Sequence, residues 1–112
     1  MKTITLPSGK SVSVPSTGDD WQLYTCSMAC GRAAASLTAA VVRVAKEIDQ
    51  MASKGYRPTE AGASHLMNKV IYPVMSKYSS FGASDTEPRG VAYDAIDRIV
   101  SVVTGDRVRY SY

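Results

Sequence analysis

Residues 19–55, DDWQLYTCSMACGRAAASLTAAVVRVAKEIDQMASKG, decide how the rest of the chain is arranged. Apolar or small side chains recur in this stretch every three or four positions, which places them on one face of an α-helix. Asp19 and Asp20 stand where a helix N-cap and a favourable first-turn charge belong, and Gly55 stands where a helix commonly ends. We therefore predict one long helix over residues 19–54. Its apolar stripe consists of Leu23, Cys26, Cys30, Ala34, Leu37, Val41, Val44, Ile48 and Met51.

The segment before this helix predicts a β-hairpin over residues 3–14. Apolar and polar residues alternate on both sides of residues 7–10, as in strands with one buried face. Residues 7–10, PSGK, carry the proline and glycine of a tight turn. Because a two-stranded hairpin is marginally stable alone, the helix or another strand has to cover it.

Two further helices are predicted after the long one. Residues 58–80 carry an apolar stripe, but Pro73 lies inside it and has no N–H for the helical hydrogen bond. We expect the second helix to be kinked or broken there, with Tyr72 displaced from helical geometry. Residues 86–104 predict the third helix, and Gly105 ends it.

The tail, residues 106–112, alternates again and favours a strand that pairs with the hairpin. These elements predict a single domain over residues 1–112, of the α+β class but mostly α, with a three-helix core. A chain of 112 residues is long enough for its own core. Its 45% hydrophobic and 21% charged residues exclude a wholly disordered chain.

Composition also bears on location and partners. The formal net charge of +3 permits an acidic partner without requiring one, because nucleic-acid-binding domains usually carry a denser basic field. The most apolar window, residues 33–42, is about half the ~20 residues that a membrane span needs. The first residues lack the apolar run of a signal peptide. We expect a cytoplasmic protein without a membrane segment.

Cys26 and Cys30 form a C-x3-C pattern on one helical face. A zinc site needs about four ligands, and His65 is the one histidine of the chain. A disulfide across one helical turn is awkward because the two Cβ vectors run nearly parallel. We expect both cysteines in the core, and neither metal, cofactor nor enzymatic activity. A Cys/His enzyme is the least favoured alternative.

Tyrosines and basic residues occur together near the ends of the predicted segments. Such pairs suit a protein-binding hot spot, and they also suit a nucleobase or a phosphate. They equally suit rings that lean on the edge of the core beside solvated charges. They share one surface only if the tail folds back over the turn between the first two helices. The candidate binding residues are Tyr56, Arg57, Lys77, Tyr78, Arg107, Arg109, Tyr110 and Tyr112.

Small residues crowd the long helix at Ala29, Gly31, 33–35 and 39–40. They allow close packing within the monomer or against a second copy, as in a homo-oligomer. Our leading hypothesis is a small, non-enzymatic interaction module that binds an unknown protein stoichiometrically. Its size and lack of catalytic motifs are typical of accessory inhibitors that phages and mobile elements direct against host proteins. The alternative is a nucleic-acid or charged-nucleotide binding protein.

Overall fold

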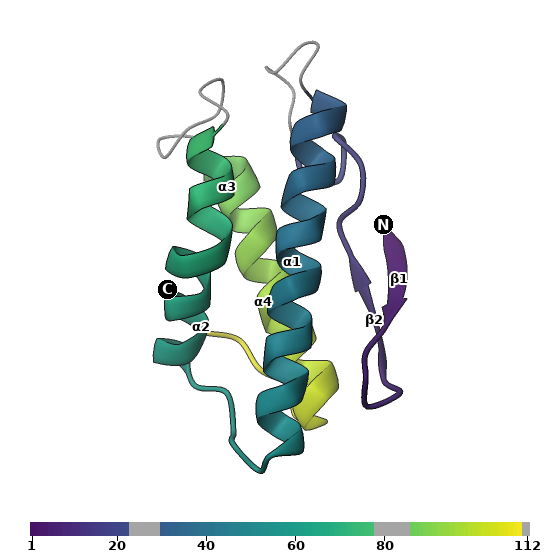
Figure 1. Ribbon diagram of the computed structural model, residues 1–112, viewed down its shortest axis with the longest axis vertical. Helices are drawn as coiled ribbons and strands as arrows, with labels where there is room; N and C mark the ends of the chain where they lie inside the picture. Colours follow the sequence, from purple (N-terminus) through teal and green to yellow (C-terminus); the bar gives the residue numbers. More distant parts are fainter. Residues whose placement is uncertain (23–29, 78–85, 111–112) are drawn as a thin grey trace.

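The computed structural model describes residues 1–22, 30–77 and 86–110, with side chains from residue 32 in the second range and from residue 88 in the third. It is an α+β fold, mostly α, as predicted. Helix α1 packs against α4, the hairpin lies on one side of α1, and the second helical segment lies on the other (Figure 1). The elements are β1 (Lys2–Thr5), β2 (Ser11–Val14), α1 (Cys30–Ser53), α2 (Glu60–Leu66), η1 (Met67–Ile71), α3 (Tyr72–Lys77) and α4 (Thr86–Thr104).

The hairpin forms where alternation predicted it. Its strands pair antiparallel, with Lys2 opposite Val14 and Thr5 opposite Ser11. Val12 and Val14 are buried, so β2 supplies the apolar face that lies against the helices. The pleat places successive side chains on opposite faces. The valines of β2 can therefore pack against the helices while the serines between them point away from the core.

The long first helix is confirmed, and its buried face is the predicted one. Leu37, Val41, Val44 and Ile48 are at most 1% exposed. The helix ends in a Schellman motif at Gly55, which adopts φ +85°. The Gly55 N–H donates to the Ala52 carbonyl, and the next N–H donates to the Met51 carbonyl, each at 3.0 Å.

The predicted start of that helix at Asp19 is wrong. Residues 17–22 form a separate turn, and Gln22 leaves helical geometry with φ +58°. Asp20 caps this short turn instead. The Asp20 N–H donates to the Thr17 hydroxyl at 3.0 Å, and the Asp20 carboxylate accepts from the Ser16 and Thr17 N–H groups. Short polar side chains compete for backbone groups in this way. Leu23 and Cys26 lie outside the described residues.

A π-helical segment, η1, interrupts the second helix and ends two residues before Pro73. The Tyr72 N–H donates to the Met67 carbonyl, an i→i+5 bond that widens the turn before the proline ring. The expected irregularity is therefore present, but Tyr72 itself stays helical, with φ −61° and ψ −37°. That detail of the prediction is wrong because the preceding turn, rather than Tyr72, absorbs the steric demand of Pro73. The segment starts at Glu60, after the cap Thr59.

Helix α4 spans the predicted residues 86–104, and Gly105 follows it with φ +77°. The tail after it pairs with neither strand over the described residues 106–110, so the predicted tail strand is wrong there. The tail runs toward α2, on the opposite side of α1 from the hairpin (Figure 1). Its backbone finds a side-chain partner instead, because the Val108 N–H donates to the Ser101 hydroxyl at 2.9 Å.

No helix among the described residues carries an apolar stretch long enough to cross a bilayer.

Candidate interaction surface

The tail folds back over the turn between α1 and α2, and two contacts bring together the segments that carry five of the candidate binding residues. Arg57 Nη2 lies 3.0 Å from Asp106 Oδ2, and the Tyr110 hydroxyl donates to the Pro58 carbonyl at 2.7 Å. These two contacts join segments about fifty positions apart in the chain. We call the region the turn–tail surface; it comprises Tyr56, Arg57, Arg107, Arg109 and Tyr110.

The residues of this surface differ in how they meet solvent. Tyr56 is 66% exposed, the largest exposed fraction among the large hydrophobic residues described. Arg107 and Arg109 are exposed, whereas Val108 and Tyr110 pack against the core. The tail therefore keeps the predicted alternation without forming a strand. One row of side chains holds the tail to the domain and the other row faces out.

The local charge of the turn–tail surface is mixed. Burial raises the pKa of Tyr110, Arg57 nearby acts to lower it, and Asp97 and Glu60 act to raise it. Arg57 is paired with Asp106, an exposed contact worth less than about 1 kcal/mol in itself. Acidic groups are thus interleaved with the arginines.

A shallow hollow of about 460 Å³ lies between the tail and α4. Arg107 and Arg109 line it from the tail, and Asp94, Asp97 and Arg98 line it from α4. Two carboxylates and three guanidinium groups therefore line the same hollow. The hollow is therefore polar and nearly balanced in charge, unlike a phosphate-binding site, which concentrates positive charge.

The other predicted binding residues do not join this surface. Lys77 ends α3, at the end of the bundle opposite the turn between α1 and α2 (Figure 1). Tyr78 and Tyr112 lie outside the described residues. Of the candidate binding residues that the structure describes, Lys77 therefore lies apart from the turn–tail surface.

The residues considered for catalysis or metal binding do not form a described cluster. His65 is exposed on α2. Cys26 and the side chain of Cys30 lie outside the described part of the structure. Over the part that is described, no three His, Cys, Asp or Glu side chains come close enough to hold a metal ion.

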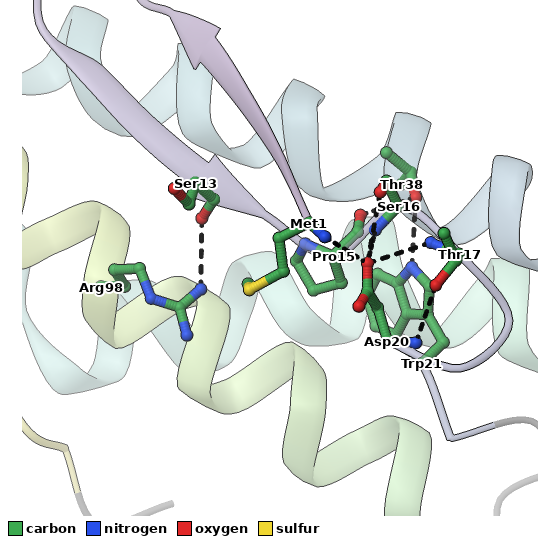
Figure 2. A network of polar contacts seen from close by, with 9 residues as sticks. All are labelled: Met1, Ser13, Pro15, Ser16, Thr17, Asp20, Trp21, Thr38 and Arg98. Carbon is green, nitrogen blue, oxygen red and sulfur yellow. Dashed lines mark hydrogen bonds and ion pairs between the residues drawn. The ribbon is translucent and has the colours of Figure 1, made fainter.

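A polar network that the sequence did not predict fixes residues 15–22 against α1 (Figure 2). Trp21 is fully buried, and its indole N–H donates to the Thr38 hydroxyl at 3.1 Å. Thr38 in turn donates to the Pro15 carbonyl at 2.8 Å. The signal available was the single tryptophan of the chain, since a large aromatic with one polar atom is usually buried with a partner.

The same network extends to the N-terminal strand (Figure 2). The Met1 amino group lies 2.9 Å from Asp20 Oδ2. This contact, with the backbone donors of Ser16 and Thr17, holds the pKa of Asp20 well below its usual range. Arg98 Nη1 of α4 also donates to the Ser13 carbonyl of the hairpin, at 3.1 Å. These contacts are architectural: they connect the hairpin to the helices.

The small residues of α1 divide between the core and the surface. Ala33, Ala34 and Ala40 are at most 5% exposed and pack within the domain. Ala35 and Ala39 face solvent. The packing interpretation therefore accounts for part of the small-residue run, and the outer alanines leave a low ridge on the outside of α1.

Comparison with known proteins gives no relative. No protein-family model, curated protein or solved structure matches the chain. What the protein binds must therefore be inferred from its own residues, above all from the turn–tail surface and the outer face of α1.

Proposed function

We propose that this protein is a small non-enzymatic module that binds another protein stoichiometrically through the turn–tail surface. Small inhibitors carried by phages and mobile elements act in this way, and we propose that class of role here. The observation that carries the proposal is Tyr56, a tyrosine 66% exposed on a turn whose backbone is fixed. Tyrosine and arginine are among the residues most enriched at protein hot spots.

The rigidity of the turn supports this role. The Tyr56 N–H donates to the Met51 carbonyl at 3.0 Å, as part of the Schellman motif at Gly55. The Tyr110 hydroxyl ties the tail to Pro58 on the same turn. A side chain presented from an ordered backbone loses less conformational entropy on binding, so more of its contact energy appears as affinity.

Charge favours a protein partner over the alternative, a nucleic acid or charged nucleotide. Asp97, Asp106 and Glu60 lie among the arginines of this surface, which weakens its attraction for a polyphosphate. Protein interfaces, in contrast, commonly combine an aromatic anchor with a mixed polar rim. The nucleic-acid alternative rests on Arg107 and Arg109, which are exposed and lie on the tail beside Tyr110.

The test is affinity capture from cells of the native source, with wild-type protein and with Tyr56→Ala, followed by mass spectrometry. Tyr56→Ala should reduce the captured partner at least about tenfold, equivalent to the loss of one hot-spot residue. The variant should keep wild-type stability, because Tyr56 is exposed and its backbone contacts remain.

The matched control removes charge instead of the aromatic group. Arg107→Ala with Arg109→Ala takes two positive charges from the same surface and leaves Tyr56 in place. For a protein partner it should weaken binding only modestly. If this double change abolishes binding in a salt-dependent way while Tyr56→Ala does not, the partner is a nucleic acid or nucleotide and the proposal is wrong.

A further inference from the structure

A groove between α1 and the η1–α3 segment lies apart from the turn–tail surface. It has a volume of about 330 Å³. One wall is aliphatic, made by Val70 and Val74, and the other is the low side of α1 at Ala39. Arg43 and Lys77 stand at its rim, and both are exposed.

A second hollow, of about 500 Å³, lies on the other flank of the same ridge. Ala35, Ala39 and Val42 of α1 line it together with Lys2 of the hairpin. Ala39 borders both hollows, so only short side chains of α1 separate them, and we call the two hollows together the depression. A helix that lies along this row of alanines could place large apolar side chains in both hollows. Helices commonly pack in this way, with rows of side chains on one helix entering the grooves of the other.

The positive charge of the depression favours an acidic partner. The charged residues that line the two hollows within the described structure are Lys2, Arg43 and Lys77, all cations. Arg43 contacts Glu47 at 3.9 Å, a long and exposed pair that leaves most of its charge available. Arg32 and Lys46 are exposed on the same side of α1 and add to the positive field.

We propose that this depression binds an acidic amphipathic helix of a partner protein. Its apolar side chains would enter the two hollows, and its carboxylates would pair with Lys2, Arg43 and Lys77. Helix-in-groove recognition uses this combination of apolar anchors at i, i+3 or i+4 and complementary rim charges. Complementary charge also speeds encounter and rejects wrong partners.

A second copy of this chain fits the depression poorly. A symmetric contact would bring Lys2, Arg43 and Lys77 of one copy against the same residues of the other. Like charges across an interface oppose association. The homo-oligomer expected from the small residues of the long helix is therefore disfavoured on this face, and the acidic partner is favoured.

The test is selection from a library of randomised helical peptides displayed on phage, followed by affinity measurement with the enriched peptides as synthetic probes. Enriched sequences should be acidic and amphipathic. Ala39→Trp fills the ridge between the hollows and should weaken binding at least about tenfold. Ala61→Trp is the matched control, since Ala61 is also an exposed helical alanine but lines neither hollow, and it should bind like the wild type.

A charge-reversed pair keeps the test informative if Ala39→Trp folds poorly. Arg43→Glu with Lys77→Glu should abolish binding, and replacing peptide glutamates with lysines should restore it. Arg107→Glu with Arg109→Glu makes the same change in net charge at the turn–tail surface and should have little effect. Tyr56→Ala should also leave peptide binding unchanged, which separates this site from the proposed function.

Several results would overturn the proposal. They are no enrichment, enrichment of basic or neutral peptides, and peptide binding that survives both the Ala39 and the charge-reversed variants. A DNA oligonucleotide that binds the wild type and Ala39→Trp equally, but not the charge-reversed pair, would identify a general anion surface instead.

Discussion

Thr38→Val tests whether the buried network of Trp21 orders the N-terminal third of the fold. Valine matches the shape of threonine but lacks the hydroxyl that accepts from the indole N–H at 3.1 Å and donates to the Pro15 carbonyl at 2.8 Å. Each buried polar group left without a partner costs about 1–3 kcal/mol. The removed hydroxyl no longer has to be buried, which offsets part of this loss. We expect a net loss of about 2–3 kcal/mol in the free energy of unfolding.

The measurement is urea unfolding followed by far-UV circular dichroism, which does not depend on Trp21 and so serves every variant. Thr38→Ser keeps the hydroxyl and should cost less than about 1 kcal/mol, the range of losing one methyl group. A Trp21→Phe background has no indole N–H that could lose its acceptor. There Thr38→Val should lower the free energy of unfolding by about 1 kcal/mol less than in the wild type.

Equal costs for Thr38→Val and Thr38→Ser would contradict this account of the network. So would a coupling energy between Trp21 and Thr38 that is indistinguishable from zero. In either case the indole of Trp21 would contribute to the turn of residues 17–22 by packing and not through its hydrogen bond.

Further predictions concern the core and the ionisable groups. Leu37→Ala should cost about 2–5 kcal/mol in urea unfolding, since Leu37 is fully buried. Arg43→Ala, which breaks an exposed 3.9 Å contact with Glu47, should cost less than about 0.5 kcal/mol; equal effects at the two sites would contradict the assigned helix face. Burial and the hydrogen bond with Tyr72 raise the pKa of Tyr93 from 10.0 to about 12. Because the folded pKa exceeds the unfolded one, its contribution to stability is complete below pH 10.0 and is lost as the pH rises toward about 12. Tyr93→Phe should lose less stability than the wild type over that range, as measured by urea midpoints; identical pH profiles would refute this.

Local sequence was sufficient where a single physical signal acted alone. The period of Leu37, Val41, Val44 and Ile48 defined the buried face of α1, and Gly55 marked its end, because both follow from backbone geometry within a few residues. Local competition misled the prediction at the start of α1. There Thr17 and Asp20 cap their own turn instead of the long helix.

The candidate sites depended on contacts between segments far apart in the chain. Sequence composition singled out Tyr56, Arg57 and Tyr110, but only the return of the tail to Pro58 brings them together. Alternation in the tail correctly predicted its two faces but wrongly predicted a strand partner. An alternating pattern shows which side chains share a face, but it does not show which segment the backbone hydrogen-bonds to.

What the sequence determined by itself was the hairpin, the main helices and their buried faces, since those follow from short-range periodicity and caps. Only the tertiary structure decided which surfaces exist: the turn–tail surface, and the depression where Ala39 of α1 and Val74 of α3 line the same hollow. The physical reason is that a surface is defined by side chains that do not pack in the core. Their neighbours depend on how the helices pack against one another, and a local sequence pattern does not determine that packing.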